Sequence, residues 1–161
     1  PEFTGIEWGA GRSTLWYAER TAALIAVEHD GAWYDRLQRI IAARGVDNVV
    51  LLRRSESVES YTEPGRALDD GLLDYAVVDG LHRDACMTIA IDKLRPGGLL
   101  VLDDAHRYLP AETRAPLAIG PIGTPPTPLW RSVAVRIADW PRIWTSDGVR
   151  DTAIWTKPGN E

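Results

Sequence analysis

The sequence predicts a doubly wound α/β fold, with a mostly parallel seven-stranded sheet that ends in a C-terminal antiparallel hairpin. Short apolar segments alternate with segments of helical periodicity, which is typical of parallel strands covered by helices on both faces. Close to the C-terminus, two short strand-like segments flank the turn Ser146-Asp147-Gly148, and such a turn joins antiparallel strands. The length of 161 residues suits one domain, and we expect residues 1–161 to form it.

The first half of the chain contains two strand-helix units. The first strand runs into a glycine turn at 9–12, and Ser13 or Thr14 caps the helix that follows. After the second strand, Asp30 is a candidate helix cap. Apolar residues then recur at helical spacing until Gly45, a typical C-terminal stop.

The second half continues this alternation and then changes character. A polar stretch with Pro64 and Gly65 separates the third strand from the fourth. Helical spacing over Arg83–Leu94 ends at the breaker 95–98, and the fifth strand follows. The Pro- and Gly-rich passage Pro110–Pro128 is long for a loop and indicates a mobile or functional segment rather than a linker. The expected strands are Phe3–Trp8, Ala22–Glu28, Val49–Leu52, Leu72–Val78, Leu99–Leu102, Arg142–Thr145 and Thr152–Thr156. The expected helices are Ser13–Glu19, Asp30–Gly45, Arg83–Leu94 and Leu129–Ala138.

Composition excludes several classes of function. The net charge of −5 has the wrong sign for binding a phosphate backbone, so we expect no nucleic-acid partner. No apolar run approaches the roughly 18 residues of a membrane helix, so we expect no membrane contact. Cys86 is the only cysteine, which rules out an intrachain disulfide or a multi-cysteine zinc site and suits a cytoplasmic protein. The first strand begins abruptly after residues 1–3, as it would after a cloning remnant. This leaves open that the native protein has an N-terminal segment that covers the site.

A Gly-x-Gly-x-x-Thr pattern at 9–14 lies where the first strand meets the first helix. Glycines there let a ligand approach the backbone, and the helix N-terminus offers free N–H groups. Glu28 ends the second strand, where an acid can accept hydrogen bonds from both hydroxyls of a ribose. Together, the glycine pattern and Glu28 favour a nucleotide-binding site. The alternatives are a tight structural turn for the glycines and a solvated acid for Glu28. Thr14 replaces the third glycine of dinucleotide-binding folds, which disfavours NAD.

Four segments resemble, in order and spacing, successive motifs of class I S-adenosylmethionine (SAM)-dependent methyltransferases. The segments are Gly5–Thr14, Val27–Glu28, Asp74–Gly80 and Leu94–Asp104. The resemblance covers residues 4 to about 107 and implies a Rossmann-like methyltransferase fold, whose reversed last strand the terminal hairpin also resembles. It implies that the glycine turn holds the methionine part of SAM, that Glu7 supports it and that Glu28 binds the ribose. The residue beside adenine is Ser55 or Glu56. The expected cofactor-binding residues are Glu7, Gly9, Ala10, Gly11, Ser13, Thr14, Glu28, His29, Ser55, Asp79 and Gly80.

The carboxyl ends of the fourth and fifth strands face the crevice where open α/β sheets bind ligands. His82 is the first candidate for a general base, His106 is the second, and Asp79 lies beside them; a histidine that only bonds a neighbouring loop is the alternative. Asp79, Asp103 and Asp104 match the positions that hold magnesium in catechol-type and macrolide-sugar O-methyltransferases, so we expect a Mg²⁺ site there. Metal-free relatives with a similar loop are the alternative.

These residues predict transfer of a methyl group from SAM to a hydroxyl of a small molecule. Arg83 and Arg107 are candidates for clamping an anionic substrate group, with surface ion pairs as the alternative. A catalytically silent SAM-binding or regulatory domain is the competing interpretation, followed by an NAD-dependent oxidoreductase. The identity of the acceptor and the formation of a homo-oligomer stay open.

Overall fold

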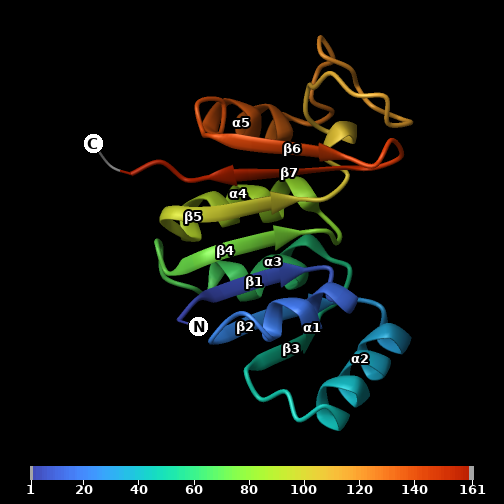
Figure 1. Cartoon of the computed structure of the whole chain (residues 1–161), viewed down its shortest axis with the longest axis vertical. Coiled ribbons are helices and arrows are strands. Elements are labelled where there is room, and N and C mark those ends of the chain that lie inside the picture. Colours follow the sequence, from blue (N-terminus) through green and yellow to red (C-terminus); the bar gives the residue numbers. More distant parts are fainter. Residues whose placement is uncertain (1, 160–161) are drawn as a thin grey trace.

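The computed structural model describes residues 2–159, which form one sheet with helices on both faces (Figure 1). The strands are β1 (Thr4–Trp8), β2 (Ala23–Glu28), β3 (Val49–Arg53), β4 (Leu73–Val78), β5 (Leu94–Leu102), β6 (Arg142–Ser146) and β7 (Asp151–Thr156). The helices are α1 (Arg12–Ala18), α2 (Gly31–Ala43), α3 (Val58–Arg66), α4 (Arg83–Lys93) and α5 (Pro128–Arg136), with one 3₁₀ turn, η1 (Ala105–Arg107). None of these helices is long and apolar enough to cross a membrane.

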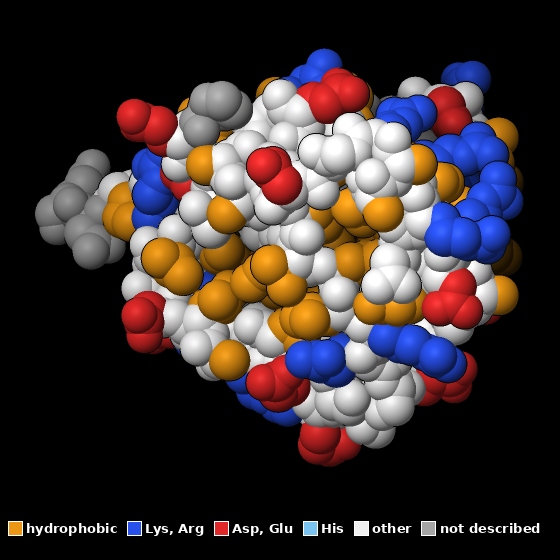
Figure 2. Space-filling view, turned by 90° about the horizontal axis from the view of Figure 1, so that it is seen from below, with side chains coloured by type: hydrophobic (Ala, Val, Ile, Leu, Met, Phe, Trp, Pro, Cys, Tyr) orange, Lys and Arg blue, Asp and Glu red, His pale blue; other side chains and the backbone are white. Residues whose placement is uncertain are grey.

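The strand order is β3-β2-β1-β4-β5-β7-β6. The first five strands are parallel, whereas β7 runs antiparallel to β5 and β6 runs antiparallel to β7. The predicted fold class is therefore confirmed, including the reversed hairpin at the C-terminus. β3 is one edge of the sheet, and Figure 2 looks onto this end of the molecule, where apolar side chains show in the hollow centre and Lys and Arg gather mainly at the periphery.

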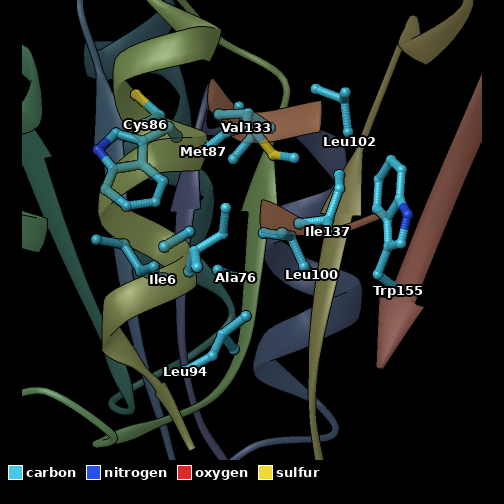
Figure 3. Close-up of a cluster of buried hydrophobic side chains, with 14 of the residues drawn as sticks. Ile6, Ala76, Cys86, Met87, Leu94, Leu100, Leu102, Val133, Ile137 and Trp155 are labelled. Carbon is cyan, nitrogen blue, oxygen red and sulfur yellow. The ribbon is translucent and has the colours of Figure 1, made fainter. Parts of the chain in front are cut away.

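Each face of the sheet has its own apolar cluster. The larger cluster lies between the sheet and helices α3, α4 and α5, and Figure 3 shows its centre, with Met87 of α4, Val133 of α5 and Leu100 of β5 among its members. The smaller cluster lies under α1 and α2 and includes Leu24 and Leu37. Fully burying one such side chain contributes roughly 1.5–3 kcal/mol, so the two clusters hold the strand ends in fixed positions.

The polar stretch after β3 contains a helix, α3, that the sequence does not predict. Ser57 caps it, because its Oγ accepts a hydrogen bond from Ser60 N at 3.2 Å. Pro64 lies inside the helix and removes one backbone donor there. Burial offsets that loss, since Tyr61 and Gly65 pack into the core and a side chain at Gly65 would overlap the ring of Trp8.

The start of β5 also differs from the expectation of a breaker at 95–98. The strand begins at Leu94, which pairs with Leu73, and the next pair in the ladder is Tyr75 with Leu99. The residues between them form a bulge that stays within the sheet. Its backbone is paired with the end of β7, because Gly97 N donates to Lys157 O at 2.8 Å. The glycines here therefore bend the strand instead of ending it.

The face of the sheet that carries α1 and α2 has no described helix over β5, β7 and β6, whereas Tyr17 of α1 stacks on Tyr75 of β4. The register places Val77, Val101, Ile154 and Ile143 in one row across β4, β5, β7 and β6. A groove of about 580 Å³ runs over this face and reaches the start of the strands at Arg95. Most of its lining residues lie on the sheet face and on α1, and Thr152 borders it beside Asp103. We call it the sheet-face groove and distinguish it from the candidate site.

Candidate cofactor and acceptor site

The carboxyl ends of β1, β2, β4 and β5 meet at one edge of the sheet. The sheet order places β2 and β3 on one side of β1 and β4 and β5 on the other, so the topological switch point lies between β1 and β4. Open α/β sheets bind ligands at this point. The two strand ends touch here, because a Cβ added to Gly9 would lie 2.7 Å from the backbone nitrogen of Gly80.

The glycine turn after β1 directs most of its amides inward. Gly9 has a φ of 97°, which favours glycine. The amides of Gly9 and Ala10 both donate to Val27 O at 3.0 Å, and Gly11 N donates to Thr14 Oγ1 at 2.9 Å. The first free amides of α1 are thus the donors that remain for a ligand, whereas Ala10 is 3% exposed and serves the turn itself.

Gly11 differs from Gly9, because the space beside it is open. A Cβ there would meet no atom closer than Ser13 Oγ at 3.8 Å. The φ of Gly11 is −162°, an extended value that other residues adopt. The absence of a side chain at Gly11 is therefore not required by the fold, and it leaves room for a ligand next to the start of α1.

Glu7 is a fully buried carboxyl group that joins β1 to α1. Its two oxygens accept hydrogen bonds from Ser13 Oγ and Thr14 Oγ1, each at 2.5 Å. Burial raises the pKa of Glu7 to about 7, although the two hydroxyl donors act in the opposite direction. Glu7 therefore changes charge near neutral pH directly beneath the glycine turn.

The two oxygens of Glu28 differ in their hydrogen bonding. Its Oε1 accepts hydrogen bonds from the backbone amides of His29 at 2.8 Å and Asp30 at 2.7 Å. In the described part of the chain, no donor reaches Oε2, and the residue is 5% exposed. The carboxylate is thus held rigidly with one free acceptor atom, which suits hydrogen bonds from a ribose. The open space at Gly11 and this free oxygen fit the SAM molecule that the sequence implies.

Residues that follow β2 and β3 form the other side of the expected cofactor site. His29 lies 6.1 Å from the ring of Tyr61, edge to face, and Ser55 is exposed just after β3. Tyr61 is fully buried, and its hydroxyl fills the space where a Cβ of Gly80 would lie, at 1.9 Å. Sequence analysis missed Tyr61 because it lies on α3, whose helical spacing is obscured by polar residues and a proline.

The side chain of Arg83 forms hydrogen bonds with the loop after β4 and with the loop after β5. Its Nε donates to Gly80 O at 3.1 Å, and its Nη2 donates to the backbone oxygen and the Oδ1 of Asp79 at 3.1 and 3.0 Å. Its Nη1 donates to Asp103 O and lies 3.9 Å from Asp104 Oδ2. Because these bonds use the guanidinium and its side chain is only 15% exposed, Arg83 joins the two loops and is neither a surface ion pair nor a free clamp for substrate.

The expected Mg²⁺ site is not supported by this arrangement. Among residues 2–159, no group of three or more His, Cys, Asp or Glu side chains is placed to hold a metal ion. The cation between Asp79 and Asp104 is the guanidinium of Arg83, and Asp103 Oδ1 instead accepts a hydrogen bond from Thr152 Oγ1 at 2.9 Å. Desolvation and the like charge of Asp103 raise the pKa of Asp79 to about 6.

The two candidate bases have different surroundings. His82 precedes α4 with a φ of 47°, and its Nε2 lies 2.6 Å from Glu56 O. A carbonyl oxygen only accepts, so Nε2 carries the proton and Nδ1 keeps its lone pair in the neutral ring. His106 is 2% exposed, and its Nδ1 accepts a hydrogen bond from Asp151 N at 3.2 Å. His106 therefore belongs to the protein interior and not to the acceptor side.

The site can be compared with known protein families and structures. The sequence profile of a family described as a methyltransferase domain matches residues 6–105, which is more than half of the chain and includes the glycine turn, Glu28 and Asp79. No sequence among the curated proteins is a significant match.

Solved structures with a similar fold include several methyltransferases. A methyltransferase from Geobacter sulfurreducens has a TM-score of 0.67 and 13% identity, covering 97% of this chain and 71% of that one. An O-methyltransferase family protein from Burkholderia thailandensis has a TM-score of 0.61 and 16% identity, covering 99% and 52%. An rRNA methylase from Streptococcus thermophilus has a TM-score of 0.60 and 11% identity, covering 98% and 88%. These likenesses show the fold, and the profile match shows the family: the chain belongs to the methyltransferases, as a SAM-dependent enzyme of class I.

Proposed function

We propose that this enzyme transfers the methyl group of SAM to a hydroxyl group of a small molecule. SAM supplies an activated methyl on a positively charged sulfur, which the hydroxyl oxygen attacks while the carbon–sulfur bond breaks and S-adenosylhomocysteine (SAH) leaves with the bonding electrons. The observation that carries the proposal is the orientation of His82. Its Nε2 is fixed on Glu56 O at 2.6 Å, which leaves Nδ1 as a proton acceptor.

On the cofactor side, the protein supplies fixed contacts at both ends of the glycine turn. The free oxygen of Glu28 would accept hydrogen bonds from the ribose hydroxyls, because its other oxygen is already held by two backbone amides. The open space at Gly11 receives the part of the cofactor next to α1. Rigid placement of this kind raises the rate by holding the reacting atoms in line.

A hydroxyl acceptor must lose its proton when its oxygen is methylated, so the acceptor side needs a base. His82 takes this proton on Nδ1, and the left-handed backbone that holds His82 supports a functional role, since such conformations concentrate at functional sites. Asp79 lies three residues earlier, and its pKa of about 6 keeps most of it ionised above neutral pH.

A small acceptor suits the charge of this edge better than RNA does. Asp79, Asp103 and Asp104 follow the strands that border the crevice, and the chain has a net charge of −5. Binding to a phosphate backbone depends on releasing counterions with Lys and Arg. The rRNA methylase among the structural neighbours therefore shares the fold with this chain, while the acidic edge favours a neutral or cationic acceptor.

The proposal is tested with calorimetry and a transfer assay. Titration with SAH measures cofactor binding, and SAM with a tritiated methyl group is then offered to phenols, catechols and sugars, with amines and ribosomal RNA in parallel reactions. We expect SAH to bind and tritium to appear on hydroxyl compounds. Transfer to RNA or amines alone contradicts the acceptor class, and SAH binding without any transfer supports a silent binding domain.

The role of His82 is tested with His82→Gln. The glutamine amide nitrogen overlays the Nε2 position and can still donate to Glu56 O, but it has no basic nitrogen. We expect SAH binding within about twofold of the wild type and turnover reduced roughly 100-fold or more, the usual contribution of a general base. Asp79→Asn serves as the comparison. If His82→Gln turns over normally and Asp79→Asn does not, the base is Asp79.

A further inference from the structure

Trp33 lies in the first turn of α2, and its indole reaches across to the glycine turn. Its Nε1 donates a hydrogen bond to Ala10 O at 2.8 Å, although 23 residues separate the two in sequence. The amide of Ala10 donates to Val27 O at 3.0 Å, so Ala10 is held at both its nitrogen and its oxygen. Helical spacing alone places Trp33 in the core, but the side chain is only half-buried.

A chain of hydrogen bonds connects this contact with the acid that faces the ribose. The backbone amide of Trp33 donates to Asp30 Oδ1 at 2.7 Å, which caps α2. The amide of Asp30 in turn donates to Glu28 Oε1 at 2.7 Å. The first turn of α2 therefore fixes the glycine turn and the free oxygen of Glu28 relative to one another.

We propose that Trp33 is a positioning residue for cofactor binding. Its indole N–H keeps the carbonyl of Ala10 turned toward α2, so that the neighbouring Gly11 presents its open side to the ligand. A Cβ at Gly11 would lie 3.9 Å from the indole nitrogen, which places Trp33 at the border of that space. This inference rests on the proposed use of SAM, because it concerns the site that the cofactor occupies.

A positioning role differs from a role in folding in what its loss changes. Trp33 is half-buried and carries Arg36 over its ring at 5.3 Å, so a phenyl ring retains much of the packing. Without the indole N–H, the carbonyl of Ala10 loses its donor, and the loss of one such hydrogen bond has a modest effect on stability. Binding suffers more directly, because the ligand then has to order the turn itself.

Trp33→Phe tests this, with Trp16→Phe as the matched control. Trp16 is 54% exposed on α1, packs against Arg20 and makes no contact with the glycine turn. By titration calorimetry we expect Trp33→Phe to weaken SAH binding by about 3- to 10-fold, the equivalent of one hydrogen bond. The control should bind within twofold of the wild type, and both variants should melt within a few degrees of it.

A measurement on the wild type covers the case in which Trp33→Phe does not fold. The indole N–H of Trp33 gives an NMR signal, and its exchange with solvent should slow when SAH orders the turn. Unchanged exchange overturns the positioning role, as does a folded Trp33→Phe that binds SAH as tightly as the control. If the wild type binds no SAH, the proposed function fails and this inference falls with it.

Discussion

Glu7 makes the stability of this enzyme depend on pH in a direction opposite to that of most acids. Its pKa rises from 4.5 to about 7 on folding, because burial disfavours the carboxylate. Between these values the folded state binds more protons than the unfolded state, so the free energy of unfolding falls as the pH rises. At about 1.4 kcal/mol per pH unit, ionisation of Glu7 costs about 3 kcal/mol in all, most of it between pH 5 and pH 8.

The comparison between wild type and Glu7→Gln isolates this contribution. Glutamine keeps the shape of the side chain and can bond both Ser13 and Thr14, but it has no charge to lose. We expect urea unfolding at pH 5, 6, 7 and 8 to show the wild type losing about 2–3 kcal/mol relative to the variant over this range. In a protein of this size, that corresponds to a drop in melting temperature of roughly 5–10 °C.

The test uses the difference in the free energy of unfolding between wild type and Glu7→Gln, because the contributions of other titrating groups largely cancel in this difference. A constant difference across pH 5 to 8 would show that Glu7 is ionised throughout, held charged by its two hydroxyl donors. A wild type that instead gains stability over the variant with rising pH would reverse the sign and refute the argument from burial.

Other substitutions separate the fold from the site. Gly11→Val should abolish SAH binding in calorimetry and leave the circular dichroism spectrum unchanged, because the space beside Gly11 is open. Gly9→Ala, at a φ of 97° and with a contact of 2.7 Å, should instead lower the melting temperature. Arg83→Met should cost about 1–2 kcal/mol in urea unfolding, because it leaves partly buried carbonyls and the carboxylates of Asp79 and Asp104 without a donor, whereas the more exposed Arg107→Met should cost less than about 1 kcal/mol. Tyr61→Phe removes a buried hydroxyl that has no partner in the described structure, so scanning calorimetry should show an unchanged or higher melting temperature.

The alternation of strands and helices could be predicted because the central parallel strands are buried on both faces. Leu73–Val78 is therefore apolar except for Asp74, and its bounds differ from the expected strand by one residue. Asp30 was recognisable as a helix cap for a local reason, since its side chain accepts a hydrogen bond from the backbone amide three residues later in the chain. Both signals lie within a few residues of the element they predict.

The features that could not be predicted depend on residues distant in sequence. α3 is stabilised by packing of Gly65 against Trp8, which outweighs its proline and polar composition. Arg83 reaches the backbone oxygen of Asp103, 20 residues away, only because β4 and β5 are neighbours, and its guanidinium also lies between the carboxylates of Asp79 and Asp104. The burial of His106 follows from the turn η1, which points the ring toward Asp151. Sequence spacing placed these residues near the crevice but did not give the direction of their side chains.

The sheet-face groove has a practical consequence for handling the protein in solution. Leu99 is 43% exposed and Trp16 is 54% exposed, and both line this groove, where water contacts apolar side chains. Salts such as ammonium sulfate strengthen contacts between such surfaces, whereas mild non-ionic detergents cover them. The protein should therefore increase the fluorescence of a hydrophobic dye while fully folded, so dye-based melting curves will begin from a high baseline, and unfolding is better followed by circular dichroism.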